Sequence, residues 1–183
     1  MSQNAVNVKR QVMSFRTCYI GLMADNYVPL KVYGVQLEDE DSFPVVILGT
    51  ADGEQSFSLS IGPYEASAIV MEMEGLLPSR PLTHDVLANM FERHNYILDS
   101  IELYALSLDG VLARLAYHHR IRHWKMELRP SDGIALALKL HAPILCDSDL
   151  LERLAPRTLS RPRTDADRFT EGRNKPNHIR RAL

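Results

Sequence analysis

The segment from Leu128 to Leu140, LRPSDGIALALKL, constrains the fold most strongly because it joins a polar turn to the most apolar helical stretch of the chain. Pro130 is compatible with a position before or at the first helical turn, Ser131 is a favoured N-cap, and Asp132 complements the positive end of the helix dipole. The residues after Gly133 leave almost no polar face. We therefore expect a buried helix whose start is held rigidly against the rest of the fold.

The polar side chains at this helix start suit two kinds of ligand. Arg129, beside a helix N-terminus, is suited to an anion such as phosphate. Asp132 would instead attract a cation. The segment alone leaves both open.

Length and composition are typical of one globular domain with short appendages: the chain has 183 residues, of which 45% are hydrophobic and 24% charged. We predict an N-terminal extension over 1–27, a domain over 28–155 and a tail over 156–183. The tail carries eight Lys and Arg against three Asp and Glu, a net charge of +5, which leaves −7 for the remainder of a chain whose total is −2. Such a tail is expected to be flexible. It either binds nucleic acid or is simply solvated.

The chain has the features of a protein of the reducing cytoplasm that has no membrane span. It contains two cysteines, Cys18 and Cys146, too few for a disulfide framework or a zinc cage. No apolar run is long enough to cross a bilayer. The segment 18–24 has the outline of a signal peptide but is short and interrupted by Gly21, so we interpret it as a leader or an extra strand.

Hydrophobic alternation and turn residues predict an α+β fold. Strands are expected at 30–37, 43–48, 55–61, 97–107, 111–117, 123–128 and 144–146. Helices are expected at 63–73 and 83–94, and the buried helix described above is expected to end at Leu140. A helical turn is expected at 148–154.

The order of three strands and two helices occurs twice, which suggests an internal duplication. A shift of 67 positions places Phe57, Leu59, Pro63 and Glu65 on Trp124, Met126, Pro130 and Asp132. The predicted fold is thus two units, each of three strands and two helices (β3-α2), that together form a mixed, mainly antiparallel sheet packed with helices. In a duplicated fold Glu65 and Asp132 would be equivalent and could face one cleft.

Three helix starts carry the residues best suited to chemistry. They are the segments 62–65, 80–85 and 129–132. Carboxylates at Glu65, Asp85 and Asp132 are of the kind that hold Mg²⁺ or Mn²⁺, and His84 could be a metal ligand or a general base. Arg80 and Arg129 could clamp a phosphodiester, with Thr83 and Ser131 beside them. Each start taken alone is better explained by capping, with Thr83 and Ser131 as caps and the acids stabilising the helix dipole.

The remaining histidines are weaker candidates. His118 and His119 are adjacent on a strand and point to opposite faces, so they cannot share a metal as a pair. The basic segment 119–125 contains Trp124 and could track a nucleic-acid backbone, or be a solvated hairpin. Ser131 lacks a Gly-x-Ser-x-Gly setting, and no phosphate loop, Cys-x-x-Cys or His-Glu-x-x-His motif is present.

The ordered motifs resemble the bifunctional nuclease domain family over about 30–154. The matching pieces are Ile61-Gly62 with Glu65-Ala66 and Ala68-Ile69, Glu74-Gly75, the segment 80–85, the segment 129–132 with 134–138, and Ala142-Pro143-Ile144. The resemblance implies two packed three-strand, two-helix units and cleavage of RNA and DNA. By this resemblance, the residues that match the family's signature polar positions are Glu65, Arg80, Thr83, His84, Asp85, Arg129, Ser131 and Asp132.

This chain also departs from the family pattern. Ser58 and Ser60 stand where the family usually has Pro and Trp, Glu127 where it has Asp, and Gly133 where it has Ala. Loss of the Trp removes a large aromatic beside the expected cleft.

Two hypotheses follow. In the first, the protein is a metal-assisted phosphodiesterase in which Glu65, Asp85 and Asp132 hold Mg²⁺ or Mn²⁺, the arginines stabilise the transition state and His84 handles a proton. In the second, it is a non-catalytic binding or regulatory module whose polar cluster is structural. Exposed sheet edges make a homo-oligomer, with a dimer favoured, a further expectation.

Overall fold

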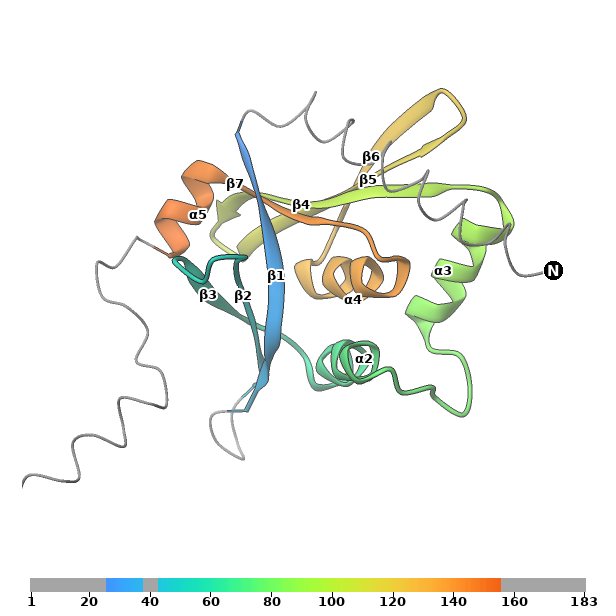
Figure 1. Cartoon of the computed structure of the whole chain (residues 1–183), viewed down its shortest axis with the longest axis horizontal. Helices are drawn as coiled ribbons and strands as arrows, with labels where there is room; N and C mark the ends of the chain where they lie inside the picture. Colours follow the sequence, from blue (N-terminus) through green and yellow to red (C-terminus); the bar gives the residue numbers. More distant parts are fainter. Residues whose placement is uncertain (1–25, 38–42, 156–183) are drawn as a thin grey trace, which may run out of the picture.

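The computed structural model describes residues 26–37 and 43–155, which form an α+β fold around one seven-stranded sheet (Figure 1). The predicted tail and all but the last two residues of the predicted N-terminal extension lie outside the described residues, as do residues 38–42. None of the described helices is both long and apolar enough to cross a membrane.

The sheet consists of two three-stranded meanders separated by one short strand. Its strands are β1 (Tyr27–Gln36), β2 (Val45–Thr50), β3 (Ser56–Ser60), β4 (Ile97–Ser107), β5 (Gly110–His119), β6 (Arg122–Leu128) and β7 (Ile144–Asp147). Their order across the sheet is β3-β2-β1-β7-β4-β5-β6. Strand β7 is antiparallel to β1 and parallel to β4, and all other pairs are antiparallel. The mixed, mainly antiparallel sheet predicted from the sequence is confirmed.

Four helices accompany the sheet: α2 (Pro63–Glu74), α3 (Thr83–Arg93), α4 (Pro130–Leu140) and α5 (Ser148–Leu154). Figure 1 shows α4 between the β4–β5 part of the sheet and α2, with α3 beside them. Helix α2 follows the first meander and α4 follows the second. The duplication itself stays a prediction, and the two halves differ because β7 separates α4 from α5.

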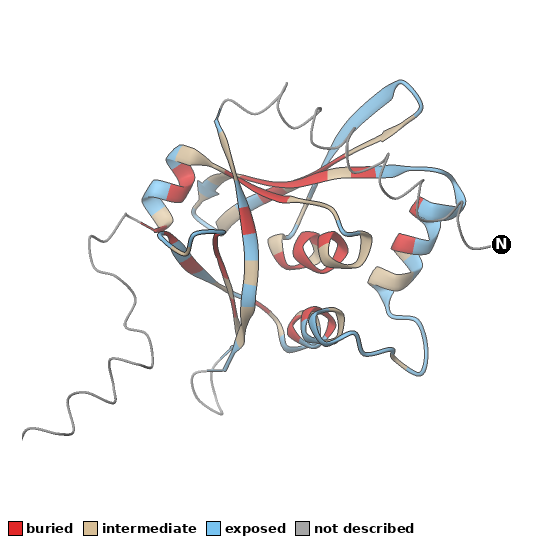
Figure 2. Ribbon diagram, in the orientation of Figure 1, coloured by how far each residue is buried: buried red, intermediate tan, exposed pale blue. Residues whose placement is uncertain are grey.

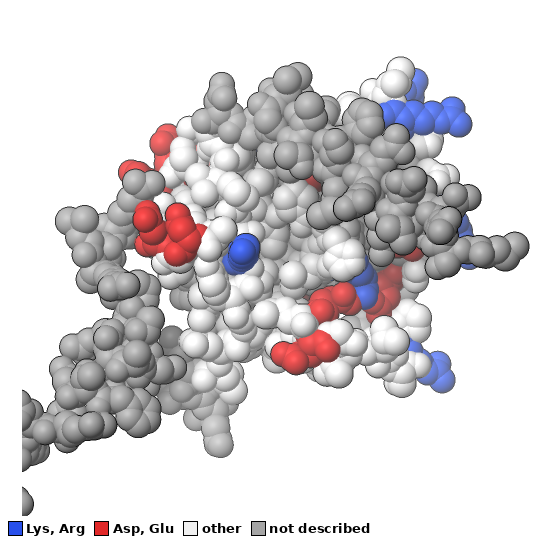
Figure 3. Space-filling view, viewed as in Figure 1, with Lys and Arg blue, Asp and Glu red and all other residues white. Residues whose placement is uncertain are grey.

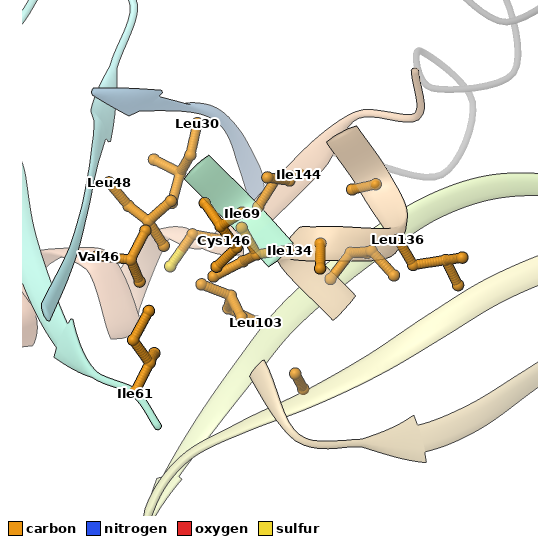
Figure 4. Packing of buried hydrophobic residues seen from close by; sticks show 14 of the residues in the cluster. Leu30, Val46, Leu48, Ile61, Ile69, Leu103, Ile134, Leu136, Ile144 and Cys146 are labelled. Atoms are coloured by element: carbon orange, nitrogen blue, oxygen red, sulfur yellow. The ribbon is translucent and has the colours of Figure 1, made fainter. Parts of the chain in front are cut away.

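Helix α4 is the buried helix expected from its composition. Residues 133–137 are all buried, and Figure 2 shows α4 as mainly buried ribbon at the centre of the fold. Figure 4 shows Ile134 of α4 gathered with Ile69 of α2, Leu103 of β4 and Cys146 of β7. At Gly133 an added Cβ would lie 2.9 Å from Cγ2 of Ile101, so the first turn of α4 approaches β4 very closely. Apolar burial on this scale fixes the helix starts relative to the sheet.

Helix α3 begins one residue earlier, and α4 two residues earlier, than the hydroxyl residues would suggest, so the prediction that Thr83 and Ser131 are N-caps is wrong. Arg129 is the N-cap of α4 and Leu82 is the N-cap of α3, both in extended conformation. Pro130 occupies the first helical position, and a residue before proline is pushed toward extended backbone, so proline sets this start. Ser131 is instead buried inside the first turn.

Close packing at Gly49 of β2 gives a testable consequence for stability. A Cβ at this position would lie 2.7 Å from the carbonyl oxygen of Gln55 and 2.9 Å from Cε2 of Tyr33. Because one obstacle is backbone, Gly49→Ala should destabilise the fold by about 2 kcal/mol and lower Tm by roughly 5–10 °C. Gly34→Ala on β1, where nothing lies within 4 Å, is the matched control and should leave Tm nearly unchanged. Thermal melts followed by circular dichroism would contradict the prediction if both variants behaved alike.

Candidate functional site

The three acids singled out in the sequence occupy the same position in three helices. Glu65 is the third residue of α2, Asp85 the third of α3 and Asp132 the third of α4. Acids in a first turn are stabilised by the N–H groups and dipole of the helix. The oxygen Oδ2 of Asp85 accepts a hydrogen bond of 2.6 Å from the backbone N–H of Leu82. Local capping therefore accounts for part of this pattern, and the contacts between helices account for the rest.

Arg129 joins the acids of two different helix starts. Its Nη2 lies 2.8 Å from Oε1 of Glu65 on α2. Its Nε and Nη2 donate to the two carboxylate oxygens of Asp132 at 2.8 and 3.1 Å, a bidentate pair. The hydrogen bonding and charge of Asp132, followed by the charge of Glu65, raise the pKa of the guanidinium above its ordinary value. The Arg129 side chain is nevertheless 67% exposed, so it can meet a ligand from solvent.

His84 brings the third helix start to the same place. Its Nε2 lies 3.2 Å from Oδ1 of Asp132, and its side chain is 18% exposed. Residues from the starts of α2, α3 and α4 thus form one continuous group, which we call the Arg129 cluster: Glu65, His84, Arg129 and Asp132. These four are among the polar positions selected from the sequence.

Asp85 belongs to a neighbouring group, the Lys139 cluster, made of Glu72, Asp85 and Lys139. The Nζ of Lys139 lies 2.5 Å from Oδ1 of Asp85 and also pairs with Glu72 of α2. Burial acts to raise the pKa of Asp85, but the hydrogen bonds from Lys139 and from the Leu82 backbone outweigh it, so the pKa is lowered. Burial acts to lower the pKa of Lys139, and its bonds to the two acids reverse this, so the pKa is raised.

The other predicted residues are distributed differently. Arg80 and Thr83 are exposed on and beside the loop that leads into α3, and Ser131 is buried in the first turn of α4. A small cavity between α2, α3 and α4 is lined by His84, Asp85, Lys139 and Glu72 together with apolar side chains. Its volume of about 10 Å³ suits about one water molecule.

The carboxylates do not converge in the way that a single ion requires. In the part of the chain that the structure describes, one group of three His, Cys, Asp or Glu side chains has ligand atoms within 4.8 Å of one another, and it is Asp99, His118 and His123. Glu65, Asp85 and Asp132 are instead held by Arg129 and Lys139. The arrangement shown does not fit one ion bound by all three.

The two clusters together carry an excess of negative charge. Their four carboxylates face two basic side chains, so the net charge is −2 with His84 neutral. Figure 3 shows acidic and basic side chains side by side over α2 and α4. This net negative charge would repel an anion such as phosphate, and an additional cation would reduce the repulsion.

Sequence reasoning missed Lys139 and Glu72. Lys139 is the one charged residue in the apolar segment 133–140, and a lone charge on a buried helix needs a partner, which is the signal that could have identified it. Its partners could not be read from spacing because they belong to two other helices.

Comparison with known proteins places this chain in a family. The family model described as Bifunctional nuclease domain matches residues 46–157, more than half of the chain. The chain therefore belongs to the bifunctional nuclease domain family.

The chain is similar to two proteins of Mycobacterium tuberculosis, one from strain CDC 1551 / Oshkosh and one from strain H37Rv, both named as uncharacterized proteins. Each is 32% identical over 122 residues, which is 67% of this chain and 73% of the relative.

Proposed function

We propose that this protein is a nuclease that hydrolyses phosphodiester bonds in RNA or DNA at the Arg129 cluster. The name of the family supports the class of reaction. The observation that carries the proposal is that Arg129, His84, Asp132 and Glu65, from three helix starts, meet at one solvent-accessible place.

His84 and Asp132 are suited to proton transfer. The carboxylate of Asp132 accepts a hydrogen bond from the Nε2–H of His84 and so orients the ring. The other ring nitrogen, Nδ1, is then the one that exchanges a proton with water or a leaving oxygen. The pairing resembles the orientation of a general base by a carboxylate in other hydrolases. In this proposal His84 transfers the proton. Asp132 orients the His84 ring and stabilises its positively charged form.

Arg129 is suited to the charge on the phosphate. Its contacts with Asp132 and Glu65 use Nε and Nη2, and the guanidinium has two further N–H donors on Nη1. A planar guanidinium matches phosphate oxygens better than an ammonium does. Exposed Arg80 and Thr83, near the start of α3, would extend the contact with the nucleic-acid backbone.

A divalent cation is part of this proposal on grounds of charge. The net charge of −2 over the two clusters disfavours phosphate binding unless a cation accompanies it, and Mg²⁺ or Mn²⁺ is the kind of ion that carboxylates bind. The prediction that Glu65, Asp85 and Asp132 together bind this ion does not fit their arrangement, because they are paired with Arg129 and Lys139 and do not form one ligand group. No catalytic step is assigned to the ion.

The direct test is hydrolysis of labelled single-stranded RNA and DNA by the purified full chain, with EDTA, Mg²⁺ or Mn²⁺. We expect cleavage that requires the added ion and follows the protein peak through gel filtration. Size exclusion with light scattering would also test the expected homo-oligomer. An absence of cleavage under all ion conditions would refute the nuclease proposal.

Arg129→Lys tests the role of the guanidinium within this assay. Lysine keeps one positive charge but cannot bridge Asp132 in a bidentate manner, so kcat/KM should fall about tenfold. Arg153→Lys on α5, a basic residue in the last turn of another helix, is the control and should retain full activity. Equal activity of the two variants would show that Arg129 does not contact the substrate.

One observation favours the second candidate, a non-catalytic binding or regulatory module. Each of the predicted carboxylates already has a basic partner from the chain itself, as expected of a network that locks helices together. In that case substitutions in the Arg129 cluster would lower Tm markedly and nucleic acid would not be cleaved by the wild-type chain.

A further inference from the structure

We infer that Asp99, His118 and His123 form a binding site for one divalent transition-metal ion, with Zn²⁺ as the ion that fits best. The site is separate from the Arg129 cluster and does not depend on the proposed nuclease activity. Its residues come from three adjacent strands, β4, β5 and β6.

The three side chains share the face of the sheet that points away from α3 and α4. Tyr117 and Trp124 stack with ring centroids 5.4 Å apart, and Tyr117 also contacts Phe91 of α3. Successive residues of a strand point to opposite faces. His118 and His123, the neighbours of these aromatics, therefore lie on the other face.

Strand pairing places the two histidines directly opposite each other. His118 of β5 pairs with His123 of β6 in the antiparallel register, and the ring centroids are 5.1 Å apart. Directly opposed side chains on one face are near neighbours, which is the geometry that two-histidine metal sites on sheets use. Adjacent His118 and His119 could not achieve this.

A β-bulge supplies the third ligand. The register between β4 and β5 shifts between Leu98 and Ser100, so Asp99 is the extra residue on its strand. Bulges re-aim side chains and occur often beside functional sites. Oδ1 of Asp99 lies 2.7 Å from Nδ1 of His118, and Oδ2 lies 3.7 Å from Nδ1 of His123.

These distances need only a small adjustment to hold an ion. The ligand atoms of all three residues lie within 4.8 Å of one another. In a tetrahedral zinc site with bonds of roughly 2.0–2.1 Å, ligand atoms are about 3.4 Å apart. The Asp99 side chain is 15% exposed and that of His118 is 23% exposed, whereas that of His123 is 44% exposed, so the ion could be reached from solvent on the β6 side.

The donor set selects among metals. Two imidazoles and one carboxylate suit Zn²⁺ and other late first-row ions, whereas Mg²⁺ and Ca²⁺ prefer oxygen ligands throughout. Three protein ligands leave a fourth position for water. Lys125, a basic side chain two residues after His123 on the same strand, is already paired with both oxygens of Glu102, at 2.9 and 3.0 Å, so its charge is compensated.

Binding of metal to the full chain tests the inference. Protein stripped with EDTA and dialysed should bind one Zn²⁺ per chain by isothermal titration calorimetry, with a Kd in the micromolar range or tighter. Excess Zn²⁺ should raise Tm by roughly 5–10 °C, because it binds only the folded chain. Co²⁺ should give the intense visible absorption of a tetrahedral site without a thiolate charge-transfer band.

Variants on the same hairpin provide the matched comparison. His118→Ala and His123→Ala should each weaken Zn²⁺ binding at least about a hundredfold, and Asp99→Asn, which preserves shape, should also weaken it. His119→Ala, one residue away on the opposite face and packed against Tyr96, should bind Zn²⁺ as the wild type does. The inference is overturned if Zn²⁺ neither binds nor raises Tm, if binding survives loss of both histidines, or if a thiolate band shows ligation by cysteine.

Discussion

Asp132→Asn is expected to lower kcat/KM on single-stranded RNA or DNA at least about a hundredfold while leaving the fold intact. The substitution keeps the shape of the side chain but removes the charge that pairs with Arg129 and orients His84. Without this charge His84 is no longer oriented, and a positioned general acid or base contributes about 10²–10⁴ in rate. Because Asp132 and Arg129 are partly or largely exposed, loss of their pairing should cost little stability, and Tm should fall by only a few degrees.

Asp149→Asn is the matched control for this change. Asp149 is also an acid in the first turn of a helix, α5, so it shares the contribution to the helix dipole but lies in a different helix from the cluster. Its variant should keep full activity. If Asp132→Asn retains the wild-type rate, a contaminating nuclease or another site is responsible for cleavage. A similar loss in both variants would point to a general effect on helix stability.

Lys139→Met is expected to destabilise the fold by about 2–3 kcal/mol at pH 7, which would lower Tm by roughly 10 °C. Lys139 links Glu72 of α2 and Asp85 of α3 to α4, and the three side chains are between 15% and 23% exposed. Removal of the cation leaves two poorly hydrated carboxylates facing each other. Loss of one partner from a fully buried pair costs about 3–5 kcal/mol, and partial exposure reduces that cost here.

The effect of Lys139→Met should depend on pH in a defined direction. In the wild type the pKa of Asp85 is lowered below its ordinary value of 3.8, so this carboxylate stabilises the fold above that pH and the contribution is lost as the pH falls through the folded-state pKa. In the variant, burial and mutual repulsion of the acids should raise their pKa values, so protonation favours its folded state. The difference in stability should therefore shrink between pH 7 and pH 4.

Urea unfolding at several pH values between 7 and 4 measures this difference. Lys31→Met, at an exposed position of β1, is the control and should change the free energy of unfolding by no more than about 0.5 kcal/mol at any pH. A destabilisation by Lys139→Met that stayed constant with pH would show that the lysine acts through packing of its aliphatic part and not through its charge.

The secondary structure could be predicted because its signals are local. Alternation of apolar residues defined the strands, and proline set the starts of α2 and α4. The strand predicted at 144–146 exists as β7, but its place between β1 and β4 was not foreseen. The choice of Ser131 as a cap was wrong because Pro130, at the first helical position, outweighed the hydroxyl preference. Thr83 is the first residue of α3, and Leu82 is its N-cap.

The sequence identified most residues of the candidate site but not which of them pair with one another. Glu65, His84, Arg129 and Asp132 were chosen from three separate segments, and the structure brings these four together. Asp85 was chosen as well, yet it joins Lys139 and Glu72 instead. The group of Asp99, His118 and His123 was missed because a β-bulge, which shifts one residue to the other face, leaves no clear signature in sequence.

Residue preferences that act over a few neighbours were enough to predict the elements, the α+β class, the burial of α4 and the polar character of its start. Which acid meets which base depended on the packing of α2, α3 and α4 against one another and on the register of β4, β5 and β6. The physical reason is range: a backbone preference is set by adjacent residues, whereas a long charged side chain pairs with whichever partner the packed core brings within a few ångströms.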